Sequence, residues 1–342
     1  VVEPGINGNT NVLIFMEGGG GCWDYMTCSE KGGAGDNAGF MGNSSKFEIG
    51  DTSTLRGATR FAMTSWPERG HDLIAQTTEM LGLDVGQLTP YAEWTKIYLP
   101  YCSQDMYVGA NTPEYSPTTP ENPNVDYLTD YSTWKEGAPN HTVDPLKFKH
   151  HGGHIVATVA SWVRKNLPQP DKLLVTGQSA GGFASELTYH YFRSTIQPNQ
   201  GYMFNDAGTF FLAENGYDEN GNVVASTLPR DRNHPQPSSF IHETIVNNEW
   251  GHRPYLKWLE AQSEGIDDDS KFRMNNIGTI SSFLSAKWPN DRFMLTTFQR
   301  DLAIAGFSYN NSGFDDDIDA PGDLVTRNLN REEFRMRDIQ NK

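Results

Sequence analysis

The sequence predicts an α/β fold with a doubly wound, mostly parallel β-sheet and long helical insertions. Short, continuous apolar runs recur along the 342 residues, and such runs are typical of strands that are buried on both faces of a parallel sheet. Two segments with helical spacing alternate with these runs, which is the pattern of a doubly wound sheet. Long polar stretches rich in glycine and proline separate the pairs, which indicates insertions between the core elements.

Five strands and two helices follow from the pattern. The strands are predicted at 12–16, 96–99, 172–176, 202–205 and 292–298. The helix at 152–167 has apolar residues at helical spacing and ends at Pro168. We expect its buried stripe to contain Ile155, Val159, Trp162 and Val163. A second helix is predicted at 181–196.

The connections near 28–90, 103–148 and 213–290 exceed ordinary loop lengths. We interpret them as helical insertions that form a lid over one end of the sheet. A length of roughly 150 residues per domain would suggest two domains. Nevertheless, α/β enzymes of this size are often one domain with insertions, so residues 1–342 are expected to form a single domain.

The net charge of the sequence argues against two classes of binding partner. The formal net charge is −16, which disfavours nucleic acid and anionic membrane surfaces because both attract cationic proteins. No apolar run approaches the ~18 residues of a membrane span, so no spanning helix is expected.

The motif Gly177-Gln178-Ser179-Ala180-Gly181 follows a predicted strand and opens a predicted helix. This is the context of a nucleophile elbow, in which a serine sits on a strained turn above the sheet of an α/β-hydrolase. The flanking glycines leave room for the turn, and the helix dipole favours negative charge beside the hydroxyl. The alternative interpretation is a glycine-rich turn with a capping serine.

The four glycines of "EGGGG" follow the strand at 12–16. Acyl transfer creates an oxyanion, and a backbone N–H group aimed at it contributes ~3 kcal/mol. In α/β-hydrolases one donor follows the nucleophile and the other lies after an earlier strand. We therefore predict an oxyanion hole made by Gly19, Gly20 and Ala180.

The "HHGG" segment at 150–153 resembles a lipase oxyanion motif, but it opens the helix that leads to the nucleophile strand. His150, His151 and His154 could also suggest a metal, and an ordinary helix start is favoured over both. We expect no metal and no cofactor.

The acid and the base should follow later strands, in the order Ser, Asp, His. Asp301 follows the strand at 292–298, but all nine histidines lie at or before His252. Three explanations remain open. The sequence ends before the catalytic histidine, which is the favoured one; His252 or His242 serves from an unusual position; or catalysis has been lost.

Four blocks together resemble the pectin acetylesterase/Notum carboxylesterase family. The blocks are "LIFMEGGGGCWDYMTC", "YLPYCSQDMYVGA", "VTGQSAGGFAS" and "FNDAGTFF". Their order and spacing match the family over roughly residues 11–305. The resemblance implies a secreted, extracytoplasmic serine esterase of the α/β-hydrolase type. Its members remove small acyl groups from polysaccharides or, in the Notum branch, a lipid from a protein.

Carried over, the resemblance makes Ser179 the nucleophile, Asp301 the acid, and Gly19, Gly20 and Ala180 the oxyanion hole. It also implies a disulfide between Cys22 and Cys28, which would stabilise the fold by about 2 kcal/mol. The family partner of Cys102 lies upstream of the glycines, and the family histidine lies downstream of the acid. Since this chain has neither and begins with Val1, we expect it to be truncated at both ends.

The family carries an aromatic residue among or just after the glycines, whereas this chain has Gly20 and Gly21 and then Trp23. A differently shaped acyl pocket is therefore expected. Trp23 and Tyr107, together with Tyr101, are candidates to stack on sugar faces, with packing in the core as the alternative for each.

The favoured function is thus a serine hydrolase that removes acyl groups, acetyl above all, from an ester such as an acylated polysaccharide. A non-catalytic binding or structural protein is the second hypothesis, and a peptidase or lipase on the same scaffold is the third.

Overall fold

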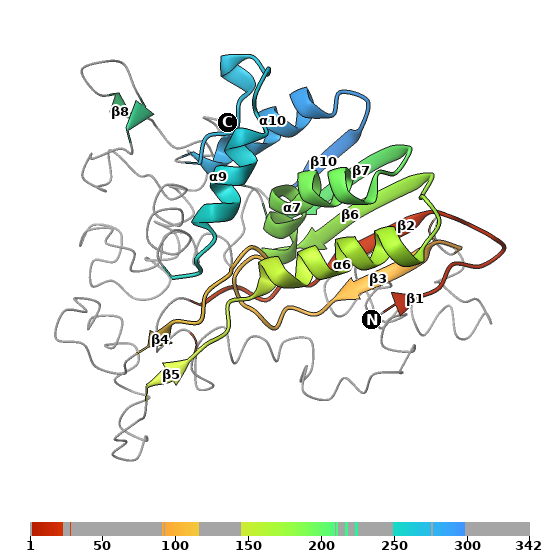
Figure 1. Ribbon diagram of the computed structural model, residues 1–342, viewed down its shortest axis with the longest axis horizontal. Coiled ribbons are helices and arrows are strands. Elements are labelled where there is room, and N and C mark those ends of the chain that lie inside the picture. Colours follow the sequence, from red (N-terminus) through yellow and green to blue (C-terminus); the bar gives the residue numbers. More distant parts are fainter. Residues whose placement is uncertain are drawn as a thin grey trace.

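The computed structural model describes residues 2–22, 28, 91, 93–115, 145–208, 210, 216–217, 223–224, 249–274 and 276–297. Its centre is a six-stranded sheet with the order β1-β3-β2-β6-β7-β10 (Figure 1). Neighbouring strands are parallel except β1, which is antiparallel to β3. The strands are β1 (Val2–Glu3), β2 (Val12–Met16), β3 (Thr95–Leu99), β6 (Lys172–Gln178), β7 (Gln200–Asp206) and β10 (Arg292–Thr296).

Two short hairpin-like pairs lie outside this sheet. They are β4 (Glu114–Tyr115) with β5 (Leu146–Lys147), and β8 (Gly216–Tyr217) with β9 (Val223–Val224). The helices are α6 (Gly152–Asn166), α7 (Ala180–Ile196), α9 (Arg253–Ala261) and α10 (Ile280–Lys287), with 3-10 turns at Asp268–Ser270 and Ile277–Thr279. The predicted α/β class with a mostly parallel sheet is confirmed. Each of the five predicted strands is present, although residue 298 lies outside the described residues.

The continuous apolar runs are buried on both faces of the sheet because successive side chains point to opposite sides. Along β2, Val12, Ile14 and Met16 belong to the large core cluster that also contains residues of α6 and α7. Leu13 and Phe15 point the other way and pack in a second cluster with Trp94, Tyr98 and Leu174. An alternating pattern would have left one of these faces in water, so the run of apolar residues is the signature of a central strand.

The strand β10 departs from this expectation. The sequence predicts burial on both faces, but the exposed fraction of Met294 is 57%. β10 pairs with β7 and is the last strand in the order of the sheet. Among the described elements, its outer side therefore lacks the neighbour that a central strand has.

The helices α6 and α7 both lie in their predicted places, but the buried stripe of α6 differs from the prediction. The buried residues are Gly152, Val156, Ala160 and Val163, whereas the exposed fraction of Trp162 is 40%. Small residues dominate the stripe because α6 packs beside α7 over the sheet (Figure 1). The spacing predicted the helix correctly, Val163 is buried as predicted, and Val159 packs against the core, but Trp162 lies outside the buried stripe.

The predicted insertions are described only in part. Of the insertion at 28–90, only Cys28 belongs to the described residues, and the described parts of 103–148 hold the short strands β4 and β5. The insertion at 213–290 contains α9 and α10, as predicted for a helical segment. The hydroxyl of Tyr255 in α9 donates to the carbonyl of Leu187 in α7 at 2.6 Å, so α9 extends the helical layer.

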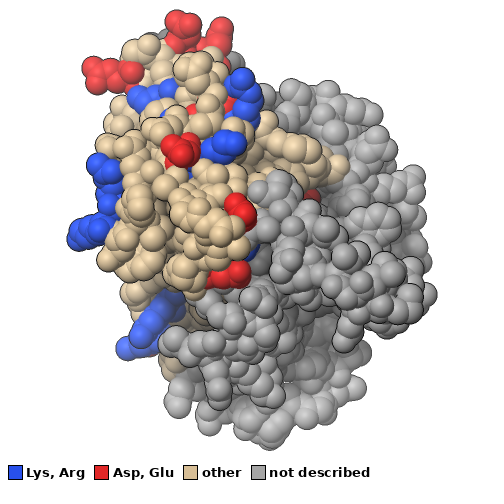
Figure 2. All heavy atoms as spheres, turned by 90° about the vertical axis from the view of Figure 1, so that its right-hand side faces the viewer, with Lys and Arg blue, Asp and Glu red and all other residues tan. Residues whose placement is uncertain are grey.

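Figure 2 shows basic and acidic side chains interspersed over the described part of one face. Among the described helices, none is both long and apolar enough to cross a membrane.

Candidate active site

The candidate site lies where the winding of the sheet reverses. From β2 the chain continues to β3 on one side, whereas β6 lies on the other side of β2. In open α/β sheets, ligands bind outside the carboxyl ends of the strands at such a switch point. The glycines that follow β2 and Ser179, which follows β6, both lie at this point, since Met16 pairs with Gly177.

Ser179 occupies a strained turn between β6 and α7. Its backbone has φ 54° and ψ −123°, a conformation that a non-glycine residue holds at a cost of about 1–3 kcal/mol. Its N–H donates to the carbonyl of Asp206 at 2.8 Å, and its carbonyl accepts from Phe183 at 3.0 Å. The side chain is half-buried at the start of a seventeen-residue helix. These are the geometric features of the nucleophile elbow that the motif predicts.

The flanking glycines are required by close approaches of the backbone. A Cβ atom on Gly177 would overlap the backbone of Gly181 and the carbonyl oxygen of Met16. A Cβ atom on Gly181 would overlap the same oxygen of Met16 and lie 2.9 Å from that of Glu17. The elbow and the end of β2 are therefore packed main chain against main chain.

The glycine loop, residues Gly18–Gly21, adjoins Ser179 directly. A Cβ atom on Gly18 would overlap the carbonyl oxygen of Gln178 and lie 3.1 Å from Cβ of Ser179. Gly19 and Gly20 have φ values of 147° and 77°, which favour glycine. Within the described residues, the N–H groups of this loop and of Ala180 make no hydrogen bond. The predicted donors Gly19, Gly20 and Ala180 therefore lie at the switch point, and no described residue accepts a hydrogen bond from their N–H groups.

The far end of the glycine loop is fixed at Cys22. Its N–H donates to the carbonyl of Gln104 at 3.1 Å, and its carbonyl accepts from the indole N–H of Trp250 at 2.6 Å. Cys22 forms a disulfide with Cys28, with the two Cα atoms 5.0 Å apart. The expected disulfide is therefore present.

Tyr107 is a core residue rather than the substrate-stacking residue that the sequence suggests. Its side chain has no exposed surface, and its hydroxyl donates to the carbonyl of Leu99 at 2.7 Å. Its ring stacks on Tyr101 with centroids 4.9 Å apart. Tyr101 is also buried, and its hydroxyl accepts from the N–H of Met106 at 2.7 Å. Both rings thus support the loop after β3, and neither is available to a sugar in this arrangement.

The "HHGG" segment forms a helix start, as favoured over an oxyanion hole. The N–H of Gly152 donates to the buried carboxylate of Asp105 at 2.7 Å, which satisfies the helix N-terminus. Burial raises the pKa of Asp105, and the Ser103 hydroxyl and the Gly152, Tyr107 and Gly109 N–H groups oppose that effect. A Cβ atom on Gly152 would overlap this carboxylate, so the segment is already filled by the protein.

The three histidines of this region do not gather around one point. His150 instead lies near Cys22 and Cys28, with all three potential metal-binding atoms within 4.8 Å of one another. The two sulfur atoms are bonded to each other, and Nδ1 of His150 donates to Ser103 O at 2.9 Å while Nε2 accepts from Tyr115 at 2.8 Å. Burial lowers the pKa of His150 to about 4, so the imidazole is neutral. Each of these atoms already has a partner.

The remaining predicted site residues are described unevenly. Asp301, Trp23 and His242 lie outside the described residues. His252 is fully buried at the residue that precedes α9, and its ring centroid lies 6.2 Å from that of Trp250. Its carbonyl accepts from the N–H of Leu256 at 3.0 Å.

Asp206 contacts Ser179, Thr296 contacts Asp206, and the sequence motifs did not point to either residue. Asp206 ends β7, its carbonyl holds the N–H of Ser179, and its carboxylate accepts from the hydroxyl of Thr296 at 2.8 Å. Thr296 ends β10, so this contact ties the nucleophile turn to the strand that leads toward Asp301. Asp206 lies in the block "FNDAGTFF", but only the pairing of β6, β7 and β10 shows what it contacts.

The family model of pectinacetylesterases matches residues 75–227, which include Ser179. No curated protein sequence matches the chain. Two crystal forms of the Wnt deacylase Notum from Drosophila are similar to it, each with 12% identity and covering 99% of this chain and 75% of that chain. Their TM-scores are 0.44 and 0.43.

The family match supports an ester hydrolase as the class of protein. The resemblance to the pectin acetylesterase/Notum family is thereby confirmed, and residues 75–227, which hold three of the four sequence blocks, are pectinacetylesterase-like.

Proposed function

We propose that the protein is a serine carboxylesterase that removes acyl groups, acetyl above all, from an ester substrate such as an acylated polysaccharide. One observation carries the proposal. The strained Ser179 at the start of α7 adjoins a glycine loop whose N–H groups have no partner within the described residues. The family match supports the ester bond as the target.

In this mechanism Oγ of Ser179 attacks the ester carbonyl carbon while a histidine accepts the hydroxyl proton. The carbonyl oxygen becomes an oxyanion, and the N–H groups of Gly19, Gly20 and Ala180 stabilise it. The bond to the alcohol then breaks, and the histidine returns the proton to the leaving oxygen. A water molecule, activated by the same histidine, hydrolyses the acyl-enzyme and releases the acid and Ser179.

Asp301 orients the histidine in this proposal, because it follows the strand β10 that carries the acid in hydrolases of this type. His252 is the candidate base within the sequence. An extracytoplasmic location is proposed because the disulfide between Cys22 and Cys28 is stable in oxidising compartments.

The test is labelling by a fluorophosphonate, followed by intact mass, with hydrolysis of a small acetyl ester measured in parallel. We expect one adduct on Ser179, and loss of both adduct and hydrolysis in Ser179→Ala. Ser194→Ala is the matched control, since this serine lies in the same helix and donates only to the carbonyls of His190 and Tyr191. Hydrolysis that survives in Ser179→Ala would reject the acyl-enzyme.

His252→Gln tests the base. Loss of labelling in this variant at an unchanged unfolding temperature identifies His252, whereas full labelling assigns the base to another histidine. A protein that takes no adduct at all would instead be a binding protein on a hydrolase scaffold. Comparison of an acetyl ester, a long-chain ester and a peptide then separates the esterase from a lipase or a peptidase.

A further inference from the structure

Glu17 is a buried carboxylate that the proposed chemistry does not use. Its exposed fraction is 7%, and one carboxylate oxygen accepts from the N–H of Tyr101 at 2.9 Å. The hydroxyl of Tyr98 also hydrogen-bonds to its side chain. No lysine or arginine of the described residues forms an ion pair with it. Burial of an ionised group without a cation opposes folding, so this glutamate needs a reason other than stability.

The position of Glu17 supplies such a reason. It is the last residue before the glycine loop, and its main chain is held on both sides. Its N–H donates to Leu99 O at 3.1 Å, and its carbonyl oxygen lies 3.2 Å from the hydroxyl of Tyr107. Together with the carboxylate contacts, these bonds attach residue 17 to β3 and to the loop that follows it.

Gly18, the next residue, packs directly against the turn that carries Ser179. Gly18 lies against Gln178 and Ser179, and the carbonyl oxygen of Glu17 lies against Gly181. The other end of the loop is attached to the same segment through Cys22 and Gln104. The glycine loop is thus a short span between two fixed ends, and Glu17 is the end that adjoins Ser179.

We propose that Glu17 is a positioning residue, whose carboxylate holds the glycine loop so that the N–H groups of Gly19 and Gly20 face the oxyanion that forms at Ser179. This inference rests on the proposed esterase function and adds a residue to that same site. A carboxylate suits the role because hydrogen bonds to an ionised acceptor are shorter and roughly twice as strong as neutral ones.

Among the described residues, the groups that face Glu17 are neutral or acidic. Tyr98 lies on β3, and Cys102 and Tyr107 lie in the loop that follows; burial and the Glu17 charge raise the pKa of the Cys102 thiol. Gln178 and Ser179 approach from the side of β6. Burial also raises the pKa of Glu17, and the Tyr101 N–H and Tyr98 hydroxyl oppose that effect. The protonated form of Glu17 is therefore favoured in the folded state. Its contribution to stability is present below the pKa that Glu17 has in the unfolded chain, and it is lost as the pH rises through the higher pKa of the folded state.

The test is Glu17→Gln, which preserves the shape and removes the charge. We expect kcat for a small acetyl ester, and the rate of fluorophosphonate labelling at Ser179, to fall about tenfold or more, the change that one stronger hydrogen bond supplies. KM should stay within about twofold because the loop acts on the transition state. The unfolding temperature at pH 7–8 should not fall, since a buried charge is removed.

Glu93→Gln is the matched control, because Glu93 is exposed and its carboxylate accepts only from Asn7 at 2.9 Å. It should leave kcat, labelling and unfolding unchanged. An unchanged kcat in Glu17→Gln rejects the inference, as does a fall in kcat that merely follows a lower unfolding temperature. If Glu17→Gln does not fold, Glu17→Asp replaces it, and here an unchanged kcat rejects the positioning role.

Ser179→Ala, measured in parallel, distinguishes a failure of the esterase mechanism from a failure of the role of Glu17. Hydrolysis that persists in Ser179→Ala rejects the esterase mechanism and this inference with it. Hydrolysis that is lost in Ser179→Ala but normal in Glu17→Gln rejects only the role of Glu17.

Discussion

Single residues of this protein show how a strained conformation is held by its surroundings. Ser179 has a positive φ, and two hydrogen bonds and two close glycine contacts hold it there. Neither Gly177 nor Gly181 has a positive φ. They are required instead because the end of β2 leaves no space for a side chain at either position.

Gly181→Ala should therefore abolish the hydrolysis of an acetyl ester and lower the free energy of unfolding by about 2–3 kcal/mol. The added methyl group overlaps the carbonyl oxygen of Met16, and main chain cannot rotate away as a side chain can. Denaturant unfolding and steady-state kinetics measure both effects. Gly265→Asn is the control, since Gly265 has φ 79° and open space around it, and asparagine tolerates that conformation. Normal kcat in Gly181→Ala would contradict the packing argument.

His190 in α7 should make the protein sensitive to acid. It is buried beside the rings of Trp258, Phe283 and Trp288, and Nδ1 accepts from the indole of Trp288 at 3.1 Å. Burial, helped by the Lys287 charge, lowers its pKa to about 4. Since the folded-state pKa is depressed, its contribution to stability is present above the unfolded-state pKa of ~6.5 and is lost as the pH falls toward 4.

We expect the free energy of unfolding to fall between pH 6.5 and about 4, and His190→Gln to show a smaller fall. Urea unfolding at pH 7.5, 5.5 and 4.5 measures the slope. Exposed His154→Gln should keep the wild-type dependence. Equal slopes in wild type and His190→Gln would show that another group controls the acid response.

At the scale of elements, the glycine loop depends on the segment 101–110 for its shape. The carbonyl of Gln104 accepts from the N–H of Cys22, and the N–H of Tyr101 donates to the carboxylate of Glu17. The hydroxyl of Tyr107 donates to the carbonyl of Leu99 at the end of β3. The disulfide closes the same end of the loop, with Trp250 bonded to the carbonyl of Cys22. The glycine loop beside Ser179 is thus held by residues far from that serine in sequence.

Replacing both disulfide cysteines with serine, in Cys22→Ser/Cys28→Ser, should lower the free energy of unfolding by about 2 kcal/mol. It should also lower kcat, because Cys22 holds the far end of the glycine loop. Chemical denaturation and acetyl ester kinetics test these effects. Ser194→Ala is the control, since this serine lies in α7 and donates to the carbonyls of His190 and Tyr191 rather than to the glycine loop. A double variant with wild-type kcat would show that the hydrogen bonds of Cys22 suffice without the disulfide.

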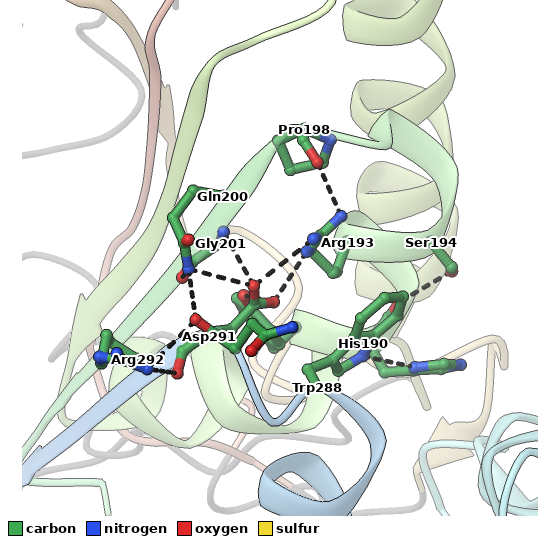
Figure 3. A network of polar contacts seen from close by, with 11 residues as sticks. His190, Arg193, Ser194, Pro198, Gln200, Gly201, Trp288, Asp291 and Arg292 are labelled. Atoms are coloured by element: carbon green, nitrogen blue, oxygen red, sulfur yellow. Dashed lines mark hydrogen bonds and ion pairs between the residues drawn. The ribbon is translucent and has the colours of Figure 1, made fainter.

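The opposite edge of the sheet is held by a buried ion pair (Figure 3). The carboxylate of Asp291, just before β10, accepts from Nε of Arg193 and the hydroxyl of Tyr189 at 2.7 Å each. It also accepts from the N–H of Gly201, at the start of β7, at 3.1 Å. This one side chain therefore joins α7, β7 and β10.

Asp291→Ala should lower the free energy of unfolding by about 3 kcal/mol or more, because the Arg193 guanidinium loses its carboxylate partner and the Tyr189 hydroxyl and Gly201 N–H lose their acceptor. Activity per folded molecule should be unchanged, since Asp291 and Ser179 lie at opposite edges of the sheet. Thermal unfolding combined with titration of active sites measures both quantities. Asp268→Asn, which alters an exposed ion pair, should not change the unfolding temperature. A loss of kcat in folded Asp291→Ala would show that the two edges are coupled.

At the scale of the whole molecule, the strand order decides where the candidate site lies. β2 and β6 are neighbours although about 160 residues separate them, and their carboxyl ends bring the glycine loop to Ser179. β7 and β10 continue the sheet in the same direction, so Asp206 and Thr296 come to the same edge.

This arrangement predicts where a phosphonyl group bound to Ser179 protects the backbone. After fluorophosphonate labelling, hydrogen exchange should slow at residues 18–22, 101–108 and 179–183. Residues 198–201 and 290–292, at the other edge of the sheet, should exchange as before. Mass spectrometry of the labelled and unlabelled protein measures both sets. Slower exchange only at the second set would place the ligand away from the switch point.

The sequence predicted those parts of the candidate site that depend on residues close together in the chain. The strand–glycine–serine–helix order around Ser179 is a local pattern, and so is a run of glycines after a strand. Tyr107 was misassigned because an aromatic residue near a site in sequence does not reveal whether its ring faces the site or the core. Asp206 and Glu17 were overlooked because their partners lie 90 and 84 residues away.

The sequence by itself determined the elements and the kind of chemistry. Periodicity sets strands and helices because it decides which side chains reach the core, and the glycine–serine motif follows from the geometry of one turn. Only the tertiary structure decided the buried stripe of α6, the half-exposed β10, and the residues that hold the glycine loop. Those depend on which strands become neighbours, and the order β1-β3-β2-β6-β7-β10 is set by packing between segments that are distant in the chain.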